Sequence, residues 1–137
     1  MKKFFALILG MSLLILNSGC REYHHHIYHQ YPEGSHYESG HSHYSASFGE
    51  LQSIEKISLN RAWSAATDAM LELGFIIVKR QKNVYFASVF AKGIGDRSVK
   101  IDLKKHDEEL TEIWIWVDRL GDESLSRLIL DKIRARA

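Results

Sequence analysis

The sequence predicts a small α+β domain, a two-layer sandwich in which an antiparallel sheet carries two helices on one face. Apolar residues recur at helical spacing in two segments, and four strand-like segments separated by short turns lie between them. Short turns between neighbouring strands favour an antiparallel meander. Two amphipathic helices on one sheet face are the simplest way to bury these apolar stripes. The predicted order is β-α-β-β-β-β-α over residues 48–137.

The first two elements are a strand over 48–57, which we expect at the sheet edge, and a helix beginning after Ser58. Serine is a favoured N-cap, and Gly74 supplies the C-terminal stop. A stripe at helical spacing predicts the core-facing side of this helix: Leu59, Ala62, Trp63, Ala66, Met70 and Leu73.

The four later strands are predicted over 75–81, 84–92, 98–105 and 110–120. Asn83 marks the first turn, and Gly93 and Gly95 mark the second. The charged segment 104–110 predicts an exposed hairpin loop, with His106 in solvent. A final helix follows, capped by Asp122 or its neighbour, with a buried stripe of Leu125, Leu128, Ile129, Leu130 and Ile133.

Two tryptophans alternate with aliphatic residues in the last strand. Ile113, Ile115 and Val117 point to one face, and Trp114 and Trp116 to the other. Aliphatic side chains suit the helix side better, which would leave both tryptophans on the open face. There they are either a partner-binding patch or the cover of a weakly packed outer surface.

Residues 1–19 have the layout of a secretory signal peptide. Lys2 and Lys3 precede a short apolar run, and the small residues Ser18 and Gly19 follow it. The run is shorter than the ~20 apolar residues that a spanning helix needs. An uncleaved anchor helix is the alternative interpretation.

Cys20 is the only cysteine and directly follows these small residues. The stretch Leu16–Cys20 resembles the lipobox of bacterial lipoproteins, although Asn17 stands where an aliphatic residue is usual. The resemblance implies cleavage before Cys20 and a covalent lipid, including palmitate, on that residue. Two or more acyl chains anchor a protein firmly to a membrane.

Residues 20–47 predict a disordered linker rich in His, Tyr, Ser and Gly, because their apolar content is too low to offset chain entropy. Imidazoles bind Zn²⁺, Ni²⁺ and Cu²⁺. The linker histidines are His24, His25, His26, His29, His36, His41 and His43. No scaffold fixes them, so we expect weak divalent-metal binding and no tight site. A functional metal or pH-sensing role is the alternative.

Charge and motifs exclude several function classes. The chain has 18 basic and 17 acidic residues and no basic block, which argues against a nucleic-acid partner. There is no phosphate-binding loop and no nucleophile elbow. Residues 48–137 contain a single histidine, His106. We therefore predict that the protein is not an enzyme and uses no cofactor.

The folded part resembles a family of short bacterial lipoproteins known only as a domain of unknown function. The resemblance covers residues 49–137. It rests on two groups of positions: Leu59, Trp63, Ala65, Leu73, Gly74 and Phe75, then Gly121, Asp122, Glu123 and Ser126. It implies export, lipidation and the α+β order, and it supplies no activity or catalytic residues.

The resulting expectation is a lipid-anchored envelope protein that acts as an interaction or structural module. Its partner would be an envelope protein or peptide held by the open sheet face. Arg21 after Cys20 does not resemble an aspartate retention signal, so the periplasmic face of the outer membrane is expected if the source has two membranes. A metal-binding lipoprotein using the linker is the alternative.

Overall fold

The computed structural model describes residues 39–137, which form a six-stranded antiparallel sheet and two α-helices. A short 3₁₀ turn lies at Ile94–Asp96. In chain order the elements are β1 (Ser42–Ser45), β2 (Glu50–Glu55), α1 (Leu59–Glu72), β3 (Ile76–Lys82), β4 (Phe86–Lys92), β5 (Ser98–Lys105), β6 (Thr111–Val117) and α2 (Glu123–Arg134). The predicted α+β class and the order from β2 onward are confirmed.

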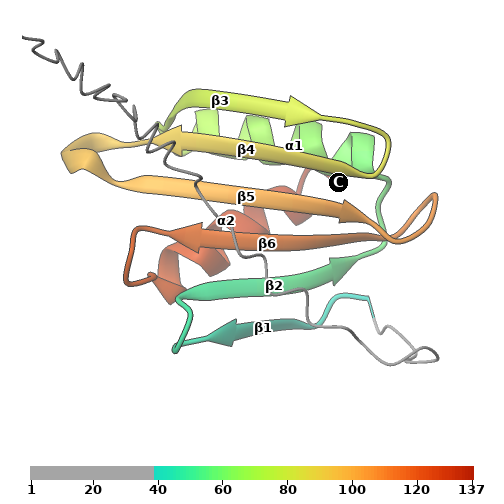
Figure 1. Ribbon diagram of the computed structural model, residues 1–137, viewed down its shortest axis with the longest axis horizontal. Coiled ribbons are helices and arrows are strands. Elements are labelled where there is room, and N and C mark those ends of the chain that lie inside the picture. Colours follow the sequence, from blue (N-terminus) through green and yellow to red (C-terminus); the bar gives the residue numbers. More distant parts are fainter. Residues whose placement is uncertain (1–38) are drawn as a thin grey trace, which may run out of the picture. The chain divides into compact units, whose positions relative to one another are not determined.

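Both helices cover the same face of the sheet, as Figure 1 shows. α1 packs on β3, β4 and β5, while α2 packs on β6 and β2. The core between the layers is aliphatic and includes Leu51, Val89, Ile101, Ile115 and Ile129, each 0% exposed. The opposite face of the sheet carries neither helix, so it is called the open face below.

The strand order is β1-β2-β6-β5-β4-β3. Strands β3 to β6 form the predicted meander, and β2 joins its far side by pairing with β6. β2 was expected at the sheet edge, and this was wrong, because β1 pairs with its other side. The edges are therefore β1 and β3.

Strand β1 lies inside the segment predicted to be a disordered linker, so the prediction fails for residues 42–45. Four residue pairs align β1 with β2. Tyr44 supplies the apolar contact that composition alone did not reveal, since its ring packs against the core. Gly40 extends the pairing, because its N–H donates to the carbonyl of Ile54 at 2.8 Å.

Both helices begin at the predicted caps. The Ser58 hydroxyl accepts from the N–H of Arg61, and the Asp122 carboxylate accepts from the N–H of Leu125. Leu128 was predicted to be buried, and this was wrong. Its side chain is 44% exposed because α2 turns it away from the sheet. Trp63 lies at the margin of the core, partly buried beneath Arg80 and Lys82 of β3.

Candidate functional site: the open face of the sheet

The two tryptophans of β6 lie side by side on the open face. Ile113, Ile115 and Val117 are fully buried under the helices, so the alternation places Trp114 and Trp116 on the other side. The predicted face assignment is confirmed. Both rings are partly buried, and their centroids lie 6.2 Å apart in an edge-to-face arrangement. Such aromatic pairs stabilise each other by ~0.5–1.5 kcal/mol.

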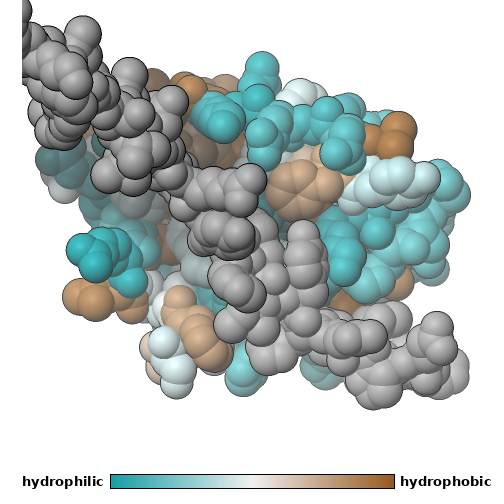
Figure 2. Space-filling view, viewed as in Figure 1, coloured by the Kyte–Doolittle hydropathy of each residue, from teal (hydrophilic) through white to brown (hydrophobic). Residues whose placement is uncertain are grey.

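The strand register sets polar side chains beside each ring. Trp114 is aligned with Gln52 of β2 and Asp102 of β5, while Trp116 is aligned with Glu50 and Lys100. Neighbouring strands lie only ~4.8 Å apart, so side chains at aligned positions on one face are in contact range. Figure 2 shows a mixture of hydrophilic and hydrophobic residues where this side of the sheet is visible.

Two clusters of polar side chains lie on this face, and Asp102 is the centre of the first. Its side chain is 1% exposed, accepts from the Ser88 hydroxyl at 2.8 Å and pairs with Lys100 Nζ at 2.7 Å. The same ammonium lies 4.9 Å from the centroid of Trp116, within cation–π range. A buried carboxylate is tolerated only when it is paired and hydrogen-bonded, and Asp102 meets both conditions.

Glu112 is the centre of the second group, and its side chain is also 1% exposed. The Gln52 amide donates to one carboxylate oxygen, and His106 Nε2 lies 3.0 Å from the other. His106 was expected in solvent, and this was wrong, because its side chain is 17% exposed and reaches back from the loop onto β6.

The sequence did not reveal these two carboxylates as site residues. Asp102 alternates with aliphatic residues along its strand, as Lys100 and Lys104 do, and this pattern does not mark it as a site residue. Only the cross-strand register shows that Asp102 lies between Trp114 and Ser88. The residues next to Asp102 in the sequence cannot predict these neighbours, because the neighbours belong to other strands.

The chemistry of the open face comes from its aromatic rings and its hydrogen-bonding side chains. Among the residues that the structure describes, no group of three or more His, Cys, Asp or Glu side chains could hold a metal ion. His106 contacts the carboxylate of Glu112 through Nε2. The face offers two indole rings and a fixed set of hydrogen-bonding groups.

The remaining predicted site residues are Cys20 and the linker histidines. Cys20 and five of the histidines lie outside the described residues: His24, His25, His26, His29 and His36. His41 precedes β1, and His43 lies on it, aligned with Gln52 at the border of the open face. No helix within residues 39–137 is long and apolar enough to cross a membrane.

Comparison with known proteins places the chain in a family. The model of the family described as "Protein of unknown function (DUF3568)" matches residues 2–136, whereas the resemblance noted from the sequence covered 49–137. No curated protein matches the chain. Because the match spans nearly the whole sequence, this protein belongs to the DUF3568 family.

Proposed function

We propose that the protein is a lipid-anchored, non-enzymatic binding module of the cell envelope, and that the open face of its sheet holds the partner. One observation carries the binding role. The helix side of the sheet has a complete aliphatic core, yet the other side carries an ordered set of indole rings, carboxylates and their partners. Aromatic residues near fixed polar groups are typical of binding surfaces.

The anchor part of the proposal rests on the sequence of the first 20 residues. A basic start, a short apolar run and small residues precede the single cysteine. An exported protein with one cysteine needs a role for that thiol, and acylation supplies it. The expected location is the periplasmic face of the outer membrane in a source with two membranes.

The absence of enzymatic activity is supported by how the two open-face carboxylates are held. A general acid or base must exchange a proton with substrate, so it needs an accessible oxygen. Asp102 is occupied by Ser88 and Lys100, and Glu112 is occupied by Gln52 and His106. These contacts fix both carboxylates as parts of a rigid surface.

Mass analysis of the mature protein tests the anchor. We expect an N-terminal peptide that begins at Cys20 and carries the mass of a diacylglycerol group with or without a further acyl chain. Cys20→Ser should abolish the modification and leave the signal peptide attached. A free thiol on Cys20 in the mature protein would contradict the proposal.

In-cell crosslinking tests the binding face. A photoreactive amino acid at Glu50, beside Trp116 on the open face, should give a discrete crosslinked product. That product should be lost with Trp114→Leu and Trp116→Leu together. Trp63→Leu is the matched control, because Trp63 belongs to α1 in the helix layer and lies at the margin of the core. Equal crosslinking in all three proteins would exclude the open face as the contact surface.

A further inference from the structure

We infer that β3, an edge strand of the sheet, binds an extended acidic peptide segment. The segment adds to the sheet as a further strand and places consecutive carboxylates beside Lys79 and Arg80. This surface goes beyond the proposed function, because β3 lies at the opposite edge of the sheet from β1 and β2, where Glu50 is found.

The backbone of β3 has hydrogen-bonding groups that no described residue uses. β3 pairs with β4 on one side and is the last strand in the sheet order, as Figure 1 shows. Within residues 39–137, Ile76–Lys82 form no backbone hydrogen bond outside the ladder with β4. All side chains of this strand except that of Ile77 are exposed. Strand addition requires a free edge of this kind, because the incoming chain is held by main-chain hydrogen bonds.

The second half of β3 has the regular geometry that a new ladder needs. The register with β4 shifts between Ile77 and Lys79 and then continues without a break from Lys79 to Lys82. A bulge protects an edge from pairing, so the regular part is where a peptide would dock. Its four residues extend over ~13 Å, which is enough for a short peptide to form ladder hydrogen bonds.

Four cations border this edge without a carboxylate partner. Lys79, Arg80 and Lys82 belong to β3, and Lys92 of β4 is aligned with Ile76. Among the residues that the structure describes, none of the four forms an ion pair. Unbalanced cations along one edge attract a ligand of opposite charge. The charge of the edge therefore selects an acidic chain.

The directions of the cations specify how its acidic residues are spaced. Arg80 and Lys82 lie 5.2 and 4.8 Å from the centroid of the Trp63 ring, on the helix side of the sheet. Lys79 points to the open face, since successive side chains alternate. A strand beside β3 alternates in the same way. Two consecutive acidic residues would then place one carboxylate near Lys79 and the other near Arg80, whose position the indole already restricts.

The same features disfavour a second copy of this protein and an anionic membrane. Two β3 strands side by side would bring cations against cations, and lysines on an edge strand are typical of strands that avoid pairing with each other. A membrane surface attracts basic residues but supplies no strand to complete the ladder. Lys79 and Arg80 also lie on opposite faces of the sheet, so they do not form one flat basic surface.

Peptide binding measured by fluorescence anisotropy tests the inference. Full-length protein in mild detergent is titrated into a fluorescein-labelled peptide with blocked ends and the sequence Thr-Val-Glu-Glu-Val-Glu-Thr. One comparison peptide has Gln in place of each Glu, which removes the charge. The other has Pro in place of the second Val, which keeps the charge but interrupts the strand. Saturable binding of the acidic peptide is expected, with ~10-fold or weaker affinity for both comparison peptides.

A pair of protein variants locates the contact. Lys79→Gln with Arg80→Gln should weaken binding of the acidic peptide by ~5-fold or more, because two ion pairs are lost. Lys56→Gln with Arg119→Gln removes the same charge at exposed positions outside β3 and should bind as the wild type does. In the wild type, the acidic peptide should also slow hydrogen exchange of the amides at Lys79–Lys82. Crosslinking through Glu50 should be unchanged in both variants, so this surface is tested separately from the open face.

Three outcomes would overturn the inference. The first is absence of binding by the acidic peptide, or equal binding by the Gln or Pro peptide. The second is binding that depends on Lys79 and Arg80 but leaves exchange of the β3 amides unchanged, which would show a contact made by charge alone. The third is binding of phosphatidylglycerol vesicles that is lost in the Lys79→Gln, Arg80→Gln variant while the peptide does not bind. That result would assign the edge to a membrane surface.

Discussion

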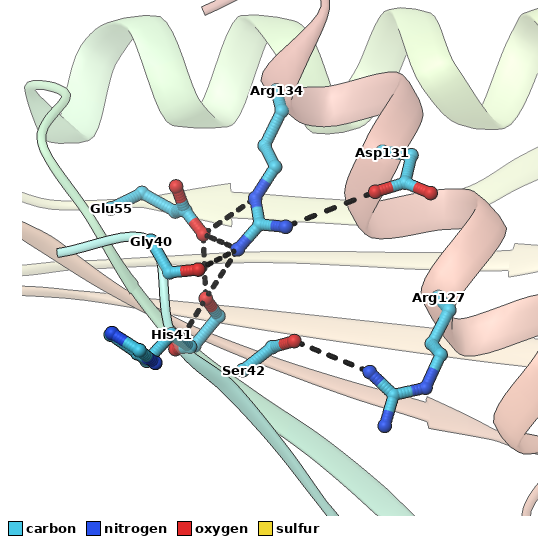
Figure 3. Close-up of polar contacts among 8 residues, drawn as sticks. Gly40, His41, Ser42, Glu55, Arg127, Asp131 and Arg134 are labelled. Carbon is cyan, nitrogen blue, oxygen red and sulfur yellow. Dashed lines mark hydrogen bonds and ion pairs between the residues drawn. The ribbon is translucent and has the colours of Figure 1, made fainter.

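Arg134 near the end of α2 donates from Nε and Nη2 to the same oxygen of Glu55 at the end of β2, at 2.9 and 2.7 Å. Nη2 also donates to the carbonyl of Gly40 at 2.9 Å, as Figure 3 shows. Glu55 is 11% exposed at its side chain and accepts from the Ser53 hydroxyl at 2.5 Å. One guanidinium therefore joins the C-terminal helix to β2 and to the residue that leads into β1.

Replacing Arg134 with Met should destabilise the domain and loosen β1. The change removes the cation that pairs with Glu55, whose side chain is nearly buried. Leaving this carboxylate unpaired should lower the free energy of unfolding by about 1–3 kcal/mol. Chemical denaturation gives the free energy of unfolding, and amide exchange at His43 and Tyr44 reports on β1. Arg61→Met, at an exposed position on α1, is the control. Equal stability of the two variants would show that the Arg134 contacts contribute nothing.

A chain that begins at residue 48 should be less stable than one that begins at residue 39. The shorter chain folds its sheet without β1, so it loses Tyr44 from the edge of the core and leaves one side of β2 unpaired. Thermal unfolding of both fragments measures the difference, and a lower melting temperature is expected for the shorter one. Identical transitions would place the true domain boundary at residue 48.

The sequence predicted those parts of the fold that depend on local pattern. Alternation in β5 and β6, the caps at Ser58 and Asp122 and the face of Trp114 are local features, and the structure confirms them. β1 was missed because its four residues contain a single large apolar side chain. Its order comes from β2 and from Arg134, whose contact with Gly40 joins residues 94 positions apart in the chain.

The candidate site was predictable only in part for the same reason. Trp114 and Trp116 stand out by periodicity within one strand. Their polar neighbours arrive from β2, β4 and β5, and the pairing register that aligns them is a property of the whole sheet. His106 was misassigned because a histidine in a charged loop is usually solvated, while here Glu112 draws it back onto the sheet.

Gly121→Ala should destabilise the domain far more than Gly95→Ala. Both glycines have positive φ, at 79° and 72°, so alanine is strained at each. A Cβ at Gly121 would clash with the Cα of Gly49, whereas a Cβ at Gly95 would meet nothing within 4 Å. We expect a cost of ~1 kcal/mol at Gly95 from backbone strain and several times more at Gly121. Equilibrium denaturation of both variants decides the comparison, and similar costs would show that the turns at Gly49 and Gly121 can separate freely.

Divalent-metal binding by the linker histidines should be weak. Each added imidazole ligand must offset the entropy of fixing its residue, ~1–2 kcal/mol for the backbone. Titration of the full chain with Zn²⁺ or Ni²⁺ should give an affinity that falls as pH drops through ~6.5, the histidine reference pKa. A deletion of residues 23–37 serves as the control and keeps β1 intact. A single tight saturable site would favour the metal-binding alternative.

Asp122 should make the domain more stable above pH ~4 than below it. The N–H of Leu125 and the guanidinium of Arg97 hold the pKa of the Asp122 carboxyl below its usual range. A lowered folded-state pKa means that the ionised form stabilises the native state, and this contribution is lost as pH falls through the folded pKa. Asn retains the helix cap without titrating, so Asp122→Asn isolates the charge. The urea midpoint of the wild type should exceed that of Asp122→Asn at pH ~6, and the difference between the two midpoints should disappear by pH ~2.5. Asp68→Asn, at an exposed position on α1, is the matched control for removal of one carboxylate. A constant offset between wild type and Asp122→Asn across this range would mean that the Arg97 contact and the charge at the helix N-terminus do not stabilise the fold.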